Sequence, residues 1–324
     1  MLTQVLHFAP YLKSVVWGGE RIALFKGIDT DITSIGESWE ISAIPGHISV
    51  VDRGPYKGKT ITELIREFGP ELVGQDIYER FGENFPLLIK IIDARDDLSV
   101  QVHPDDILAM KRHSCYGKTE MWYIIDTKPN TKIHIGLKKP ITPDEYERRV
   151  ADHSIMDVIN SYNSIAGDTY FLPAGCIHTI GAGNLLAEIQ QTSDITYRIY
   201  DYGRLDKDGN TRQLHTEEAR DAIDYTVNQI HKLQPKGSLL ADCPYFVVTQ
   251  HNVGKEVIRL PRTRESFTIV MCLDGQALLT CSTKENNPDD SQSIHIVRGE
   301  TLLFPATLRH ITATGEANIL SVQA

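Results

Sequence analysis

Four polar side chains in this sequence have types and spacings that suit a divalent-metal site. Gln101 and His103 lie two residues apart in an apolar segment, and His178 follows a Pro-Ala-Gly turn at the end of another apolar segment. Because residues i and i+2 of a β-strand face the same side, the amide and imidazole of the first pair are expected to point together. Glu120 opens a third expected strand. An amide, two imidazoles and a carboxylate that converge on strands predict a metal site, and therefore an enzyme.

The composition indicates a soluble globular protein. The chain has 324 residues, of which 41% are hydrophobic and 23% are charged, and such fractions are typical of a packed core with a polar surface. The formal net charge of −10 argues against nucleic acid and anionic membranes as partners.

The cysteines and the apolar runs bear on the cellular compartment. Five scattered cysteines without a CxxC pair indicate a reducing environment. Met1–Pro10 lacks the basic start and long apolar core of a signal peptide, and no run approaches the ~18 apolar residues of a membrane span. We therefore expect a cytoplasmic protein.

The elements that must position the metal site are predicted to be mainly strands. Strand and turn patterns cover residues 1–55, 85–137, 165–200 and 245–324. Helices are expected within residues 60–82, where Thr60 and Glu63 form a potential capping box, and from Thr142 and Thr216 onward. The fold class is therefore mainly β with a few helices.

An internal repeat indicates two related β-barrels. Gly299–His310 repeats the Gly, acid, Thr, Pro-Ala and His positions of Gly167–His178 at the same spacings. The second copy has no Gln-x-His pair, and Thr268 falls near the place of Glu120. With Gln234–Ser238 as the best linker candidate, we expect a catalytic domain at 1–234 and a C-terminal domain without a metal site at 235–324.

Several motifs together resemble the type I mannose-6-phosphate isomerases, in their short bacterial form, within the cupin superfamily. The motifs are Trp17–Gly19, Gly36–Glu40, Leu98–Asp106, Gly117–Tyr123, Gly167–His178 and Ser193–Arg198. This resemblance implies two cupin-like (jelly-roll) β-barrels, with a few helices packed on the N-terminal catalytic part. It implies one Zn²⁺ ion per chain, held by Gln101, His103, Glu120 and His178. It also implies the interconversion of D-mannose 6-phosphate and D-fructose 6-phosphate through an enediolate.

The resemblance also assigns roles around the metal. The family's catalytic arginine corresponds to Arg198, whose permanently charged guanidinium suits an oxyanion better than a proton transfer. Three groups remain candidates for the proton carrier: Asp194, His103 and a metal-bound water or hydroxide. The family's pattern brings four donors toward the phosphate or the sugar oxygens, namely Ser99, Lys90, Lys118 and Arg204.

Two other functions are compatible with the same residues. An iron-dependent cupin oxygenase would use two histidines and a carboxylate with open positions for oxygen, and Gln101 argues mildly against it. A non-catalytic sugar-binding cupin would not need Arg198 and Asp194 beside an intact metal set. For the leading hypothesis, the expected partner is a small sugar phosphate, and the expected assembly is a monomer or weak homodimer.

Overall fold

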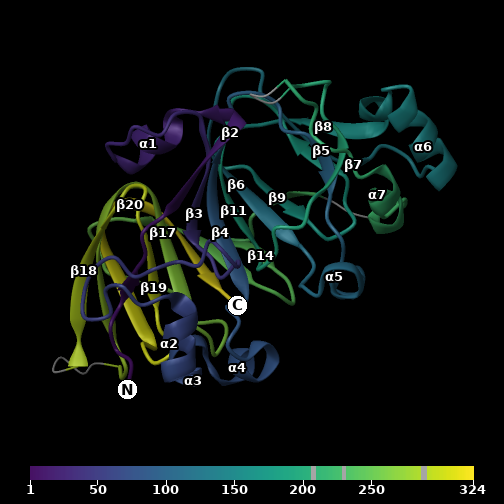
Figure 1. Cartoon of the computed structure of the whole chain (residues 1–324). Coiled ribbons are helices and arrows are strands. Elements are labelled where there is room, and N and C mark those ends of the chain that lie inside the picture. Colours follow the sequence, from purple (N-terminus) through teal and green to yellow (C-terminus); the bar gives the residue numbers. More distant parts are fainter. Residues whose placement is uncertain (206–208, 228–230, 286–289) are drawn as a thin grey trace.

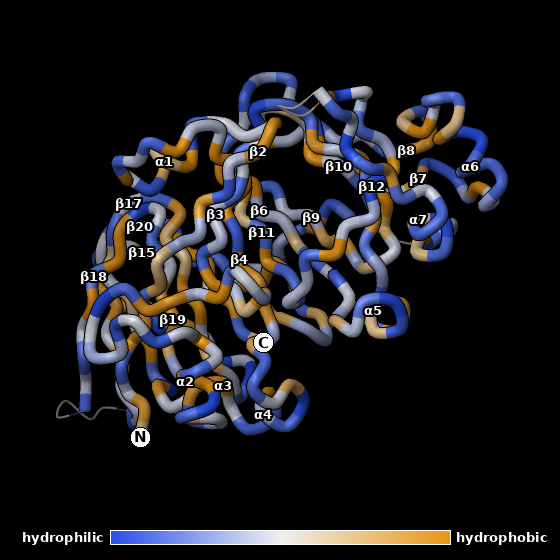
Figure 2. Tube along the Cα trace, viewed as in Figure 1, coloured by the Kyte–Doolittle hydropathy of each residue, from blue (hydrophilic) through white to orange (hydrophobic). Residues whose placement is uncertain are grey.

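The computed structural model describes residues 1–205, 209–227, 231–285 and 290–324 (Figure 1). Within these ranges the strands form three largely antiparallel sheets, so the prediction of a mainly β chain is confirmed. Figure 2 shows hydrophobic segments along the strands and hydrophilic ones in loops and outer helices. No helix among the described residues is long and apolar enough to cross a membrane.

Two sheets face each other in the first part of the chain and enclose the predicted metal site. The seven-stranded sheet, in spatial order, consists of β13 (Lys232–Leu233), β9 (Thr169–Leu172), β6 (Glu120–Thr127), β11 (Asn184–Gln191), β4 (Leu87–Asp93), β3 (Ile35–Ile41) and β2 (Tyr11–Gly19). The five-stranded sheet consists of β12 (Tyr197–Tyr200), β5 (Val100–Val102), β10 (His178–Ile180), β7 (Lys132–Leu137) and β8 (Ile159–Asn163). One buried cluster contains side chains of both sheets, including Trp122 and Ile135.

The inner strands β4 and β11 of the seven-stranded sheet are buried along their whole length, which explains their nearly continuous apolar sequences. Along β4, Ile89 and Ile91 belong to the cluster that joins this sheet to the C-terminal sheet. Ile92 belongs to the cluster between the seven-stranded and five-stranded sheets, and Lys90 lies on that same face because strand residues alternate. The apolar residues before and after Lys90 therefore fix its position in the strand, with its charged side chain on the inner face of the sheet.

The third sheet has eight strands among the described residues. It follows the order β1 (Leu6–His7), β19 (Thr301–Phe304), β17 (Thr268–Ser282), β20 (His310–Gln323), β15 (Val247–Val253) and β14 (Leu239–Asp242), and in addition β16 (Ile258–Arg259) pairs with β20 and β18 (Gln292–Val297) with β17. Leu6 pairs with Leu303, so the first strand of the chain joins the C-terminal sheet. The two-barrel description and the boundary at residue 234 remain predictions.

The helices cover the outer faces of these sheets (Figure 1). α6 and α7 contribute to the cluster on the outer face of the five-stranded sheet, and α2 to α4 pack near the C-terminal sheet. The helices are α1 (Arg21–Lys26), α2 (Ile61–Phe68), α3 (Pro70–Val73), α4 (Gln75–Phe81), α5 (Asp106–His113), α6 (Pro143–Ala151) and α7 (Thr216–Ala222), with a 3₁₀ helix, η1 (Ile155–Val158).

The predicted helical region at 60–82 contains three short helices, α2, α3 and α4. Thr60 and Glu63 form the expected capping box. Gly69 and Gly74 then break the helix with φ angles of 48° and 94°, and a Cβ on Gly74 would lie 2.1 Å from the carbonyl oxygen of Glu265. The helices predicted from Thr142 and Thr216 are present. α1 and α5 lie in segments for which only strands were predicted.

The internal repeat corresponds to equivalent local structure. β9 and β19 each begin two residues after the repeated glycine, and β10 and β20 begin at the repeated histidines His178 and His310. Glu120 pairs with Leu172, and Thr268 pairs with Phe304 at the equivalent place. Thr268 Oγ1 accepts a hydrogen bond of 3.0 Å from a glutamine amide, so this position of the C-terminal sheet holds a neutral hydroxyl.

Candidate metal centre and substrate cavity

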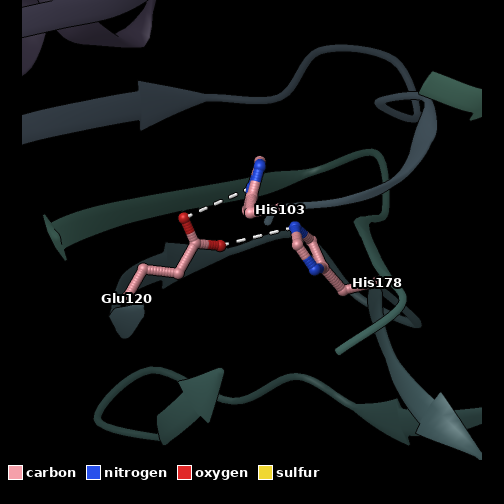
Figure 3. Close-up of side chains that lie close together, drawn as sticks. All are labelled: His103, Glu120 and His178. Carbon is pink, nitrogen blue, oxygen red and sulfur yellow. Dashed lines mark ion pairs between the residues drawn. The ribbon is translucent and has the colours of Figure 1, made fainter. Parts of the chain in front are cut away.

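The candidate metal centre lies between the seven-stranded and five-stranded sheets. β5 and β10 are neighbours in the five-stranded sheet, and their register places His178 directly opposite Gln101. His103 follows β5 by one residue, and Glu120 begins β6 in the facing sheet. Figure 3 shows the carboxylate of Glu120 facing both imidazole rings, with one oxygen directed toward each ring. Four polar side chains from three strand regions therefore meet, as predicted.

The potential ligand atoms are close enough to share one ion. One atom from each of His103, Glu120 and His178 lies within 4.8 Å of the others. His178 Nε2 is 3.4 Å from Glu120 Oε1, and His103 Nε2 is 3.6 Å from Glu120 Oε2. The amide nitrogen of Gln101 lies 3.2 Å from His178 Nε2. All three members of the triad are buried.

Backbone carbonyls fix both imidazoles in the tautomer that a metal requires. His103 Nδ1 lies 2.9 Å from the carbonyl oxygen of Ile195, and His178 Nδ1 lies 2.8 Å from that of Cys176. Because a carbonyl oxygen can only accept, each Nδ1 carries the proton and each Nε2 presents a lone pair toward Glu120. This second layer of hydrogen bonds is typical of histidines that bind metals.

The protonation of the triad also suits a cation. Burial, followed by the charge of Lys118, lowers the pKa of His103 well below its ordinary value and that of His178 to about 3. Both rings are therefore neutral ligands at pH 7. Burial raises the pKa of Glu120, because its charge has lost water. Glu120 Oε1 is buried and has no hydrogen-bond partner among the described residues, so a bound cation would satisfy it.

Lys118 is the positive group that contacts the triad. Its Nζ donates to His103 Nε2 at 2.9 Å and to Glu120 Oε2 at 2.5 Å. Lys118 is almost fully buried. A metal ion at the triad would bind His103 Nε2 and Glu120 Oε2 in place of the Lys118 ammonium. Lys118 could then donate hydrogen bonds toward the adjoining cavity.

A cavity of about 420 Å³ adjoins the centre, a size within the range of small-molecule sites. Alternating residues of two strand regions line it, with Ser99 and Gln101 on one and Asp194, Thr196 and Arg198 on the other. The cavity is also lined by Lys13, Val15, Trp17, Glu37, Lys90, Ile92, Leu98, Lys118, Ile180, Glu188 and Arg212.

One side of the cavity carries alternating charges, and we call it the lysine–glutamate wall; its residues are Lys13, Glu37, Lys90, Glu188 and Lys118. Lys13 Nζ lies 3.4 Å from Glu37, and Lys90 Nζ lies 3.6 Å from Glu37 and 3.0 Å from Glu188. Burial opposes the charge of Lys90, but Glu188 and Glu37 keep its pKa above the ordinary value. Burial likewise opposes the charge of Glu188, but Lys118 and Lys90 lower its pKa to about 2. The wall is therefore charged but largely self-neutralised.

Another side carries guanidinium groups, and we call Arg198 and Arg212 the arginine wall. Arg198 Nη1 donates to the carbonyl oxygen of Gln213 at 2.9 Å. Its buried Nε has no hydrogen-bond partner in the described part of the chain. Asp201 accepts from Arg212 Nε at 2.7 Å and from Arg204 Nη2 at 2.6 Å. Burial and the neighbouring Arg212 lower the pKa of Arg198.

The structure thus gathers most of the predicted residues around one centre and one cavity. Arg204 is different, because it pairs with Asp201 and is not among the residues that line the cavity. Its contact with substrate stays a prediction. Sequence analysis did not single out Glu188, Glu37 or Arg212. Glu188 could have been noticed as one charge within the apolar run Leu185–Ile189, whereas Arg212 follows a loop and carries no such signal.

Comparisons with known proteins identify the family of this chain. Residues 5–136 match the model of the catalytic domain of type I phosphomannose isomerase. A mannose-6-phosphate isomerase of Streptococcus mutans is 31% identical over 332 residues, covering 99% of this chain and 98% of that protein. Another from Bacillus subtilis is 35% identical over 284 residues, covering 85% of this chain and 87% of that protein.

The fold agrees over the whole length as well. The crystal structure of the mannose 6-phosphate isomerase from Bacillus subtilis superposes with a TM-score of 0.85 at 31% identity, and the match covers 99% of each chain. The similarity therefore includes the C-terminal sheet, which lies beyond the 5–136 match.

Proposed function

The chain belongs to the family of type I mannose-6-phosphate isomerases, and we propose that it interconverts D-mannose 6-phosphate and D-fructose 6-phosphate with one Zn²⁺ ion per chain. The observation that supports this proposal is the buried triad of His103, Glu120 and His178, which lies beside a cavity lined by Arg198 and Lys118. The relatives named above supply the identity of the sugar phosphate.

The proposed zinc ligands are the triad and Gln101. Two neutral imidazoles, a carboxylate and an amide carry one negative charge, so a bound Zn²⁺ would leave the centre net positive. When bound, the ion would supply Lewis acidity that stabilises negative charge on the sugar oxygens O1 and O2. The amide oxygen of Gln101 is a weak electron-pair donor to a metal, so the Lewis acidity of the bound ion would stay high.

Arg198 is the proposed stabiliser of the enediolate. During isomerisation a proton leaves C2, negative charge develops on the oxygens of C1 and C2, and a proton is delivered to C1. A guanidinium keeps its own protons at neutral pH and can donate two parallel hydrogen bonds. The buried Nε of Arg198 without a partner fits a donor that is aimed at a ligand.

Asp194 is the proposed proton carrier between C2 and C1. It is exposed and lines the cavity, on the same side of its strand region as Arg198. His103 is less suitable, because its Nδ1 donates to a backbone carbonyl and its Nε2 faces the metal centre. The geometry therefore favours Asp194 over His103.

The remaining polar groups are proposed to hold the substrate. Ser99, Lys90 and Lys118 line the cavity and can donate to the sugar hydroxyls or to the phosphate. Arg204 is proposed to act through Asp201, with a direct contact to substrate still a prediction. We further propose that the enzyme works in the cytoplasm, as a monomer or weak homodimer.

A coupled assay tests the function directly. The metallated protein is incubated with mannose 6-phosphate, and the fructose 6-phosphate formed is measured, together with the metal content of the chain. Turnover with about one zinc ion per chain is expected. Fully metallated protein that forms no fructose 6-phosphate would contradict the proposal, and redox-active iron in its place would favour an oxygenase.

A further inference from the structure

We propose that Arg212, oriented by Asp201, binds the phosphate group of the substrate at the arginine wall of the cavity. The inference rests on the proposed function and adds a specificity-determining residue to it. Two charged walls line the same cavity, and they differ in whether they can bind a dianion without displacing an existing partner.

Each ammonium group of the lysine–glutamate wall already has a carboxylate partner within the wall. Lys90 Nζ lies within 4 Å of both Glu188 and Glu37, and Lys118 Nζ lies 3.9 Å from Glu188, a partner that it keeps when a metal binds Glu120. A phosphate brought to these ammonium groups would meet the buried carboxylates that already hold them. Like charges at such short range in a poorly solvated site repel strongly. The lysines are therefore better suited to neutral hydroxyl groups of the sugar.

The arginine wall has an excess of positive charge. Arg198 has no carboxylate partner among the described residues, while Arg204 and Arg212 share the single carboxylate of Asp201. Even with the exposed carboxylate of Asp194 included, the guanidinium groups outnumber the carboxylates. In a chain with a formal charge of −10, such a local excess needs a reason, and an anionic ligand provides one.

Arg212 is the member of this group that is both fixed and accessible. Its Nε and Nη2 donate to the two carboxylate oxygens of Asp201, which is only 6% exposed at its side chain. This fork sets the plane of the guanidinium before any ligand arrives. The Arg212 side chain keeps 22% exposure and lines the cavity. A guanidinium has a second edge of N–H donors that suits phosphate oxygens.

Arg204 shares the same carboxylate but is placed differently. Its guanidinium donates to the backbone carbonyl of Asp97 and lies 5.4 Å from the ring centre of Tyr202. It does not line the cavity. Arg204 therefore orients Asp201 from outside the cavity. Asp201 in turn orients the guanidinium of Arg212 toward the cavity, where the ligand would bind. Asp201 is a positioning residue, and Arg212 is the residue that contacts phosphate.

The test compares Arg212→Gln, Arg212→Lys and Asp201→Asn with Arg148→Gln, which removes an exposed guanidinium on α6. The measurements are KM and kcat for mannose 6-phosphate, and the inhibition constants of inorganic phosphate and of free mannose. For R212Q we expect KM and the phosphate inhibition constant to rise together by about 10- to 100-fold, as for the loss of charged hydrogen bonds. The mannose constant should change less than about twofold, because mannose has no phosphate.

The other variants separate positioning from contact. R212K keeps the charge but loses the fork, so its KM should lie between those of the wild type and R212Q. D201N should raise KM and the phosphate constant together while melting within a few degrees of the wild type. R148Q should match the wild type in every measurement.

Two outcomes would overturn the inference. One is an R212Q protein whose phosphate inhibition constant equals that of the wild type. The other is a rise in the mannose constant equal to the rise in the phosphate constant, which would indicate general damage to the cavity. If the wild type fails to convert mannose 6-phosphate, the proposed function fails separately. Calorimetric titration of wild type and R212Q with inorganic phosphate would then still decide the role of Arg212.

Discussion

Arg198 and Gln101 are cross-strand partners in the antiparallel pair of β12 and β5. Directly opposed residues of such a pair have Cβ atoms about 4.5–5.5 Å apart. One strand pair therefore fixes a proposed metal ligand and the proposed oxyanion stabiliser relative to each other. Since His178 is opposite Gln101 on the other side of β5, three site residues share one line across the sheet.

Replacing Arg198 should affect the chemical step more than metal binding. We expect Arg198→Gln to lower kcat by roughly 10²–10³-fold, the usual effect of losing a donor to a developing oxyanion. Arg198→Lys should recover part of this loss only, because an ammonium lacks the fork. Steady-state kinetics and zinc analysis check the prediction. A variant that loses zinc in proportion to activity would contradict it.

Removing a triad ligand should remove the metal. In His178→Ala and in Glu120→Gln we expect the zinc content to fall from about one per chain toward zero after dialysis, because each variant loses one of the three strong ligands and keeps only two of them beside the weakly donating amide of Gln101. Elemental analysis of the purified variants measures this. His310→Ala, at the equivalent position of the repeat, is the matched control and should keep the wild-type zinc content.

A change at Gln101 should separate metal affinity from Lewis acidity. Gln101→Glu adds a second carboxylate to the ligand set, so zinc should be retained while its net charge falls. We expect kcat to decrease by at least about tenfold, since a less positive centre stabilises an enediolate less. Zinc analysis and kinetics are measured on the same preparation. Unchanged turnover with full zinc occupancy would refute the idea.

The buried ion pair of Lys26 and Glu40 should matter for stability. Lys26 Nζ donates to Glu40 at 2.9 and 2.7 Å and to the carbonyl oxygen of Gly299 at 2.6 Å, so it ties α1 and β3 to the C-terminal part. Lys26→Met would leave the carboxylate buried and unpaired, and we expect a loss of about 3–5 kcal/mol in the free energy of unfolding. Lys59→Met removes an exposed partner of Glu67 and serves as the control in denaturant titrations. Equal midpoints for the two variants would contradict the prediction.

Glu188 should make the metal-free protein sensitive to acid. Lys118 and Lys90 lower its pKa to about 2 against the opposing effect of burial. A carboxyl whose pKa is lowered by folding stabilises the folded state above its unfolded pKa of about 4.3, and this contribution is lost as pH falls toward 2. Denaturant titrations of metal-free protein between pH 5 and pH 2.5 should therefore show a smaller loss of stability in Glu188→Gln than in the wild type. An identical slope in both proteins would count against the assignment.

The convergence of the proposed metal ligands could be predicted from sequence because mostly local features place them. The i, i+2 spacing of Gln101 and His103 and the repeated turn before His178 are local features. The register that pairs Thr268 with Phe304 also agrees with the predicted equivalence to Glu120. The charge pairing in the cavity was not predictable, because Lys90 and Glu188 meet only through the register of β4 and β11.

Other differences arise from short elements and tertiary contacts. α5 has eight residues and low amphipathicity, and its start is set by Asp105, which accepts from the backbone N–H of Leu108. The helical region after Thr60 is divided at Gly69 and at Gly74, and Gly74 approaches the backbone of Glu265, a contact that the sequence does not reveal. Arg212 was not predicted because its proposed role depends on its pairing with Asp201, 11 residues earlier in the chain.

The pairing of β1 with β19 has a consequence for synthesis of the protein. The ribosome makes Leu6 and His7 long before their partners Leu303 and Leu302. The apolar side chain of Leu6 therefore lacks its strand partner until that later segment has been made. Contacts between such distant segments close late and slow folding. A nascent chain that ends before Leu302 would lack this strand pairing, and its uncovered segment would be a target for chaperones and proteases.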